Sequence, residues 1–519
     1  MALTRKQLVD IFSDKRVMDD AATLEAYSHD QSFAPKRMPD FVVFPGTVEE
    51  VQRVVRLANE TRTPLIPYSS GLNFHGAALP DHGGIIVNLS RMNRIIQIDE
   101  ENWSAVIEPG VTYAQLQAAL MEKGFRVMIP FGVPPGRSVL TSFLERDPVM
   151  AAPSFESGNF LIMDTEMVLP DGELFKTGTW CAGGAPGGPL GPVRNVIFRL
   201  WTGAQGTLGI MTKMNVKIEP FIKERKMYFL SFNALADARE PLKRIQRREI
   251  GLECFLLNRF NLASLVSHEW AVPDTFPAAP KPSESFERYR GILPAWVLAL
   301  CIAGAPRHPE EKIAYEAEAL QEVCHGLNVE VKETIPQVSG LSRLMLNEIL
   351  YPWGILKKFN YRGSVHSLSF KCSLPSVAAM EEVLRKECEA AGYSIAAFGG
   401  YVLPLERGRA VHCEFDLHCD LNDDLETRRV KNLWTVVSQA LINQGAYFDR
   451  PYGPWAEMAG QANAEGVFKW VDSNGQRIEG QNLAATRRID YKRTTPLPDG
   501  PVSRGGSQSG RRRPAGSSV

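Results

Sequence analysis

The first 220 residues alternate short β-rich runs with helical stretches, and this alternation constrains the fold more than any other feature of the chain. Asp40–Phe44 predicts a strand that ends at a proline, and Thr47 followed by Glu50 has the spacing of a capping box that opens a helix. A second strand over Pro64–Pro67 leads into a loop rich in glycine and serine. Strands spaced this closely predict an α+β half of the molecule.

Residues 225–445 repeat a different pattern, in which strands alternate with longer helices. The spacing predicts βαββαβ units, and therefore a second domain built on an antiparallel sheet with helices on one side. Strands are expected at Met227–Phe232, Leu252–Leu257, Trp296–Ala303, Asn328–Glu333, His366–Cys372, Ile395–Leu403 and Ala410–His418. Residues 499–519 are so rich in Gly, Ser, Pro and Arg that we expect a disordered tail.

Charge and cysteine content exclude several classes of protein. The chain has 58 Lys and Arg against 59 Asp and Glu, so its net charge of −1 gives no whole-protein reason to bind nucleic acid. No apolar run approaches the roughly 18 residues of a membrane span, and the charged N-terminus predicts no secretory signal. The 8 cysteines contain no CxxC pair. They suit a reducing compartment, so we expect a cytoplasmic protein without a cysteine-ligated cluster.

The loop over Pro67–Ala77 is the first candidate site. A loop of glycines and small residues after a strand exposes consecutive backbone N–H groups, which can hold a diphosphate as an anion-binding nest. Such a loop alone is more often a simple turn than a phosphate site. It matches neither the Walker pattern nor GxGxxG, so the sequence indicates neither an ATP loop nor the usual nicotinamide fold.

A strand in the second half carries the second candidate site. Because side chains of a strand alternate between its two faces, the apolar residues Cys413, Phe415 and Leu417 should pack on the helices. The opposite face then presents its polar residues either to water or to a cavity. Two histidines and two carboxylates would also suit a divalent metal, but acid/base or hydrogen-bonding work is favoured. The residues of this polar face are His412, Glu414, Asp416 and His418.

The third candidate site is the dipeptide Asp449-Arg450, within the run Gly445–Gly453. Arginine stays charged at all accessible pH values, and its guanidinium can bind a carboxylate or phenolate with two hydrogen bonds. A surface arginine paired with the neighbouring Asp449 is the alternative interpretation, and it is about as common.

Several ordered motifs make the chain resemble the vanillyl-alcohol oxidase/4-cresol dehydrogenase family, which includes the flavoprotein of p-cresol methylhydroxylase. The resemblance is strong over about residues 35–220 and looser over 366–455. It implies a two-domain FAD-binding fold with an antiparallel-sheet cap domain over the flavin. The motifs are FVVFPGTVEEVQRVVRLAN, SSGLNFHGAA, IVNLSRMNRIIQID, SAVIEPGVTYAQL, MDTEMVLPDGELFKTG and GTLGIMTKMNVKIEP.

The resemblance also implies domain limits and site residues. Residues 1–222 would bind FAD, residues 223–445 would form the cap, and residues 446–498 would return to the first domain. Catalytic or substrate-binding roles fall on His412, Glu414, Asp416, Asp449 and Arg450. Cofactor-binding roles fall on Ser69, Ser70, Gly71, Leu72, Asn73, His75, Glu108, Pro109, Gly206, Thr207, Gly209 and Ile210, and no metal role is assigned.

The expected function is oxidation of a small molecule by hydride transfer to the flavin N5. Family members that oxidise phenols bind the phenolate with two tyrosines and an arginine. Here the first tyrosine position falls near His75, the second is Asp449, and Arg450 is retained. An aromatic alcohol or para-substituted phenol is the first substrate class. A D-2-hydroxy acid is the alternative, because Ala26–Asp30 and Arg450 resemble the lactate/glycolate branch.

A non-catalytic flavin-binding subunit is the third alternative. No haem or iron–sulfur motif is present in the sequence, so electrons would pass to oxygen or to an electron-accepting protein. A homo-oligomer is expected.

Overall fold

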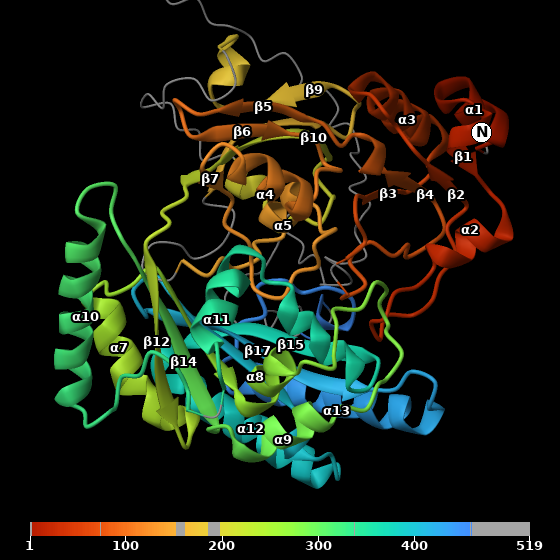
Figure 1. Cartoon of the computed structure of the whole chain (residues 1–519). Coiled ribbons are helices and arrows are strands. Elements are labelled where there is room, and N and C mark those ends of the chain that lie inside the picture. The colour runs from red at the N-terminus through yellow and green to blue at the C-terminus, as the bar shows by residue number, and fades with distance from the viewer. Residues whose placement is uncertain are drawn as a thin grey trace, which may run out of the picture.

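The computed structural model describes residues 3–72, 74–151, 161–184, 198–336, 338–456 and 458. The predicted contact residue Asn73 and the predicted tail 499–519 lie outside the described residues, as does the return segment 446–498 apart from its first residues. In Figure 1 the red-to-yellow part of the chain lies above the green-to-blue part. No helix within the described ranges has the length and apolarity that crossing a membrane requires.

The first sheet begins the α+β half and has the strand order β1-β2-β4-β3. Parallel pairing joins β2 and β3 to the central β4, whereas β1 is antiparallel to β2. Its strands are β1 Val17–Met18, β2 Phe41–Val43, β3 Leu65–Tyr68 and β4 Ile85–Asn88. The predicted helix is α3 (Val48–Thr61), and the Thr47 hydroxyl accepts a hydrogen bond from the Glu50 backbone N–H. Only this half of the expected capping box forms, because the Glu50 carboxylate instead accepts from the Gly46 N–H and from Arg16.

The second sheet is antiparallel and has the order β5-β6-β10-β8-β9. One apolar cluster fills the space between this sheet and the helices α4 and α5. The strands are β5 Ile95–Asp99, β6 Ser104–Ile107, β8 Ile162–Val168, β9 Leu174–Lys176 and β10 Ile210–Lys217, and the helices are α4 Tyr113–Met121 and α5 Val139–Leu144.

The third sheet has six strands in the order β12-β14-β13-β16-β17-β15, and every neighbouring pair is antiparallel. The predicted antiparallel sheet is therefore confirmed. Its strands are β12 Arg225–Phe232, β13 Glu253–Asn258, β14 Trp296–Ala303, β15 Ser364–Ser373, β16 Gly399–Leu405 and β17 Ala410–Cys419. The expected strand over Asn328–Glu333 is wrong: in this segment only Lys332 forms an isolated bridge, to Phe229.

Helices cover both faces of this sheet, which corrects the expectation that they lie on one side. One face packs on α7 (Arg239–Arg247), α10 (Pro309–His325), α12 (Val377–Ala390) and α13 (Asp424–Asn443). The other face packs on α8 (Arg259–Val266) and α11 (Leu341–Leu350), and also on Phe131 and Met150 from the first half of the chain. The second face therefore joins the two halves, and the predicted site residues of the second half lie at its β15–β17 end.

The remaining elements are short or peripheral. They are α1 Arg5–Phe12, α2 Ala21–Ala26, α6 Phe198–Trp201, α9 Glu284–Ile292, β7 Phe125–Arg126, β11 Glu219–Pro220 and the 3-10 helix η6 Gly354–Asn360.

Candidate active site and cofactor cleft

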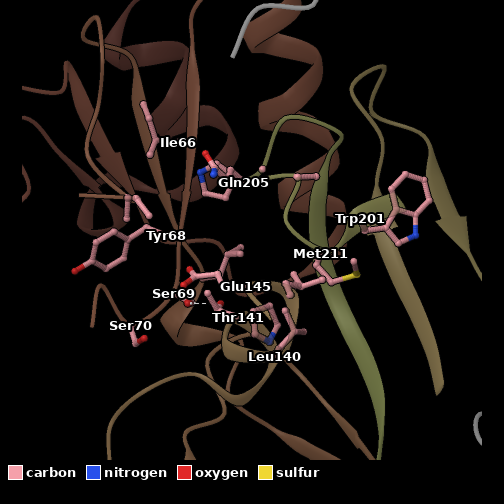
Figure 2. A pocket seen from close by; sticks show the side chains of 18 of the residues that line it. Ile66, Tyr68, Ser69, Ser70, Leu140, Thr141, Glu145, Trp201, Gln205 and Met211 are labelled. Atoms are coloured by element: carbon pink, nitrogen blue, oxygen red, sulfur yellow. Dashed lines mark hydrogen bonds between the residues drawn. The ribbon is translucent and has the colours of Figure 1, made fainter. Parts of the chain in front are cut away.

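A deep cleft opens where the end of β3 meets the segment that leads into β10. It encloses about 1030 Å³ of space, part of it open to solvent, which is at the upper end of small-molecule sites at roughly 300–1,000 Å³. Figure 2 shows Ser69, Thr141 and Glu145 converging on its centre, with Gln205 and Met211 on the opposite wall.

The loop after β3 forms one wall of the cleft and exposes its backbone. The Ser69 hydroxyl hydrogen-bonds to Thr141 at 2.7 Å, and the Ser138 N–H donates to the Ser70 hydroxyl at 3.1 Å. Within the described residues, no acceptor is found for the backbone N–H groups of Ser70, Gly71 and Leu72. Gly71 has φ +65°, and a Cβ there would lie 1.9 Å from the Tyr68 hydroxyl. Only glycine therefore fits this turn, whose free N–H groups suit an anion.

A second glycine-rich segment forms the opposite wall. A Cβ on Gly206 would approach the Pro67 ring to 3.0 Å, and a Cβ on Gly209 would lie 2.5 Å from the Val168 carbonyl oxygen. These two glycines let the segment before β10 lie directly against β3 and β8. The cleft is therefore narrow and walled largely by backbone.

Charge in the cleft is balanced by ion pairs. Arg137 lines the cleft, and its Nη2 lies 2.6 Å from Glu145 Oε2 and 3.0 Å from Asp147 Oδ2. Free backbone N–H groups and hydroxyls, rather than unpaired cations, are thus the donors offered to a ligand. This donor set fits a diphosphate bridge, which backbone nests hold well.

The structure brings together most of the predicted cofactor residues but not all of them. Glu108 accepts hydrogen bonds from Arg94 beside the cleft, and the Thr207 hydroxyl donates to the Ala204 carbonyl. Ile210 packs in the apolar cluster behind β4, and His75 lines a separate cavity. Seven predicted residues line the cleft: Ser69, Ser70, Gly71, Leu72, Pro109, Gly206 and Gly209.

The second-half sheet presents its polar face as the period-two pattern predicts. Cys413, Phe415 and Leu417 pack in the cluster with α12 and α13. On the opposite face, Ser369 of β15 and Tyr401 of β16 lie directly across from Glu414. The face is buried rather than solvated: His412, Asp416 and His418 have no exposed surface.

Glu414 is the exception on this face, with 22% of its side chain exposed. Its Oε1 lies 2.9 Å from His412 Nε2. Burial acts to raise the pKa of Glu414, but the hydrogen bond and charge of His412, helped by Lys358, hold that pKa below its usual value. Glu414 is therefore an ionised carboxylate held by a buried histidine.

The other acidic residues are paired with cations that sequence reasoning missed. Lys358 Nζ lies 2.7 Å from Asp416 Oδ2, and Lys371 Nζ lies 2.8 Å from Asp449 Oδ2. Alternation along β15 was the available signal, because Ser367, Ser369 and Lys371 alternate with Leu368, Phe370 and Cys372. Lys358 comes from η6 and carried no such signal.

Arg450 binds across the two halves of the molecule. Its Nη1 pairs with Asp147 and its Nη2 donates to the Ser369 hydroxyl at 2.6 Å. The alternative interpretation, a surface arginine paired with the neighbouring Asp449, is not what the structure has: Arg450 is largely buried and pairs with a carboxylate 303 residues away.

His75 lies in a second, smaller cavity with Phe33, His366 and Trp455, and Tyr452 lines both this cavity and the cleft. Burial lowers the pKa of His75 to about 4, and Arg450 lowers it further while Glu414 opposes the shift. Arg450 and Glu414 both lie against Ser369, which faces Glu414 across the β15–β17 pair and accepts a hydrogen bond from Arg450. Tyr452 therefore lies between the cofactor cleft and the cavity that holds His75.

Comparison with known protein families shows what the first half of the chain binds. Residues 39–178 match a protein-family model described as FAD binding domain. The chain carries an FAD binding domain. The glycine-walled cleft lies largely within it, and the unpartnered N–H groups and paired charges described above fit FAD.

Two solved structures share the fold of almost the whole chain. Substrate-bound p-cresol methylhydroxylase has a TM-score of 0.72 and 19% identity, covering 88% of this chain and 90% of that one. A 4-ethylphenol oxidase from Gulosibacter chungangensis, in complex with isoeugenol, has a TM-score of 0.72 and 21% identity, covering 89% and 92%. The predicted two-domain FAD-binding fold of the vanillyl-alcohol oxidase type is confirmed.

Similarity in sequence is more restricted. The glycolate oxidase subunit GlcD of Bacillus subtilis is 30% identical over 227 residues, which is 43% of this chain and 46% of that protein. The flavoprotein subunit of 4-cresol dehydrogenase from Pseudomonas putida is 32% identical over 211 residues, 38% of each chain. The chain thus matches less than half the length of these curated relatives.

Proposed function

We propose that this protein is an FAD-dependent oxidoreductase that oxidises a neutral alcohol, with an aromatic alcohol or para-substituted phenol as its substrate class. Bound FAD supplies the hydride acceptor, N5 of its flavin ring. The observation that carries the proposal is Glu414, a partly exposed carboxylate on an otherwise buried polar face, directly across the sheet from Ser369, whose hydroxyl accepts a hydrogen bond from Arg450.

Glu414 is the proposed general base. Because its pKa lies below the usual value, it is ionised at neutral pH and can accept the hydroxyl proton of the substrate. As the substrate carbon gives up its hydrogen as hydride, loss of the hydroxyl proton to Glu414 leaves a carbonyl product. His412 holds the carboxylate in place through the 2.9 Å hydrogen bond, and is a positioning residue.

The charge balance favours a neutral substrate. Four cations lie at or near the site, and each is paired with at least one carboxylate: Lys358 with Asp416, Lys371 with Asp449, Arg450 with Asp147, and Arg137 with Glu145 and Asp147. Glu414 adds a further negative charge. Among the residues that the structure describes, a substrate carboxylate or phenolate entering this site would meet no uncompensated positive charge, and its desolvation would not be repaid.

A D-2-hydroxy acid is the second candidate. Sequence relationship favours it, since the relatives include a glycolate oxidase subunit and the D-lactate dehydrogenase [cytochrome] of Arabidopsis thaliana, 27% identical over 201 residues. This reading would require the substrate carboxylate to displace Asp147 from Arg450.

Anaerobic mixing of the flavin-loaded protein with 4-hydroxybenzyl alcohol or with D-lactate separates the candidates. We expect loss of the oxidised-flavin absorbance with the alcohol and at least about tenfold slower loss with D-lactate. Faster reduction by D-lactate would replace the first candidate with the second. Failure of both substrates, in protein that still photoreduces, would indicate a flavin-binding subunit without turnover of its own.

Glu414→Gln tests the base directly. Reduction by the alcohol should slow by about 10²- to 10⁴-fold, the usual contribution of a general base, while FAD content stays normal. Glu381→Gln is the matched control, because Glu381 is also a buried carboxylate but bonds Trp296 on the other face of the sheet. Equal reduction rates in the two variants would exclude Glu414 as the base.

The electron acceptor is proposed to be oxygen or a partner protein. Timing the reoxidation of the photoreduced protein in air distinguishes them. Reoxidation within seconds supports oxygen, and reoxidation over many minutes supports a protein acceptor.

A further inference from the structure

One carboxylate in the first half of the chain binds two arginines that belong to different parts of the site. Asp147 Oδ2 accepts from Arg137 Nη2 at 3.0 Å and from the Ser142 hydroxyl at 2.7 Å, while Asp147 Oδ1 pairs with Arg450. Arg137 lines the cofactor cleft. Arg450 reaches the cap sheet through Ser369. Asp147 is therefore the common partner of the cleft and of the predicted catalytic face.

Asp147 is fixed in place by its surroundings. Its side chain is 5% exposed, and its backbone N–H donates to the Ser142 carbonyl at 3.1 Å. Ser142 also accepts a hydrogen bond from Tyr113, whose side chain is buried under α5. Burial would raise the pKa of Asp147, but Arg137 and Arg450 hold it below its usual value. The group is thus an ionised, immobile anchor.

The two arginines are not equally dependent on Asp147. Arg137 has Glu145 as a second carboxylate, at 2.6 Å. For Arg450, among the described residues, Asp147 is the only carboxylate within ion-pair distance, and its other recorded contact is the neutral Ser369 hydroxyl. Loss of the Asp147 charge would leave Arg137 paired with Glu145, but would leave the buried Arg450 with only the more distant charges of Asp449 and Glu414, so that its side chain is no longer held in place.

We propose that Asp147 is a positioning residue that holds Arg450 against the site and couples it to occupancy of the cofactor cleft. This inference rests on the proposed function, because it concerns how the oxidation site is assembled. Asp147 belongs to none of the sequence motifs and lies outside the predicted catalytic set.

Asp147→Asn tests the proposal by two independent measurements. Removing one negative charge beside two arginines makes the site more positive, which favours the reduced, anionic flavin, so the midpoint potential should shift to more positive values. The rate of flavin reduction by the alcohol should nevertheless fall by about 100-fold, because Arg450 keeps its charge at the site but loses the alignment that Asp147 imposes. A stronger driving force combined with a slower reaction is a result that simple loss of folding does not give.

Glu145→Gln is the comparison variant. It removes the other carboxylate on Arg137 and leaves the pair between Asp147 and Arg450 intact, so its potential should also rise while its rate falls only a few-fold. In the Arg450→Met background, Asp147→Asn should cause little further loss of rate, because contacting residues are non-additive. Full additivity of the two substitutions would overturn the proposal.

A second variant covers a failure of Asp147→Asn to fold, and photoreduction covers a failure of the proposed function. If Asp147→Asn yields no folded protein, Asp147→Glu keeps the charge but moves it by one methylene, and should bind FAD normally while reducing more slowly. If no alcohol reduces the wild-type protein, the proposed function fails, but photoreduction still gives the midpoint potentials. An Asp147→Asn potential equal to that of the wild type would then overturn the coupling to the cleft.

Discussion

The cofactor cleft and the polar face of the cap sheet are built from different groups: the cleft from backbone donors, and the cap face from paired side-chain charges. The cleft offers backbone N–H groups and hydroxyls from two glycine-bearing segments, with Arg137 held in ion pairs. The cap face offers buried side-chain charges from several elements, each matched to a partner. A backbone site demands glycine at fixed places, whereas a site of charge pairs demands tertiary contacts. The cleft should therefore tolerate substitution of its glycines poorly, and the cap face should tolerate loss of one member of an ion pair poorly.

The largest effect on cofactor binding is expected from a substitution in the glycine turn of the cleft. Gly71→Ala would place a Cβ 1.9 Å from the Tyr68 hydroxyl, so the loop must move, and we expect affinity for FAD to fall by at least about 100-fold. Flavin absorbance of the purified protein, followed by titration with FAD, measures the loss.

Gly124→Ala is the matched control for this substitution. Gly124 also has a positive φ, at +78°, but a Cβ there meets nothing within 4 Å. It carries the same backbone strain without the clash. Stoichiometric FAD in Gly71→Ala would show that the cleft does not depend on this turn.

A loss of stability, rather than of cofactor binding, is expected when one charge pair of the cap is broken. Lys371→Met leaves Asp449, whose side chain is 2% exposed, without its partner, and should lower the free energy of unfolding by about 3–5 kcal/mol. Denaturant titration of the FAD-loaded protein measures it. Lys226→Met removes the same type of residue from an exposed pair with Glu333 and should cost less than about 1 kcal/mol. Similar losses in both variants would contradict the contrast between buried and exposed charge.

The smallest effect concerns pH. Burial, with a smaller contribution from His75, lowers the pKa of His366 to about 3, whereas an unfolded histidine has a value near 6.5. The unfolded state therefore binds the proton first. The stabilisation is complete above about pH 6.5 and is lost as the pH falls towards 3, by about 1.4 kcal/mol per pH unit.

His366→Phe should remove this share of the pH dependence while retaining the stacking on Phe33, whose ring centroid lies 3.8 Å away. Urea titrations at pH 5 and pH 7 give the slope. His308→Gln, at an exposed histidine, should leave the slope as in the wild type. An unchanged slope in His366→Phe would show that this ring is not held neutral.

Sequence patterns predicted local structure well and tertiary pairing poorly. The strand alternation placed Cys413 and Phe415 in the core and Glu414 opposite them, because a period of two is a local property. The glycine loop was located for the same reason. The expected strand at residues 328–333 does not form. This segment lies beside β12, but only Lys332 pairs with it, through a single isolated bridge to Phe229.

The ion pairs could not be predicted because their partners are distant along the chain. Lys358 and Asp416 are 58 residues apart, and Arg450 and Asp147 are 303 apart. Nothing in the residues around Asp147, in the turn after α5, indicates that its partner is Arg450. A pair between Asp449 and Arg450 was one of two interpretations, and the structure instead pairs Asp449 with Lys371 on β15.

The pairing of Asp147 with Arg450 also bears on how the protein is made. Ribosomes add about 5–20 residues per second, so the 303 residues between them represent roughly 15–60 seconds of translation. During that interval the aspartate has been synthesised and the arginine has not. Within the nascent FAD-binding half this carboxylate has only Arg137 and Ser142 as partners, and its contact with the cap can form only after Arg450 has been synthesised.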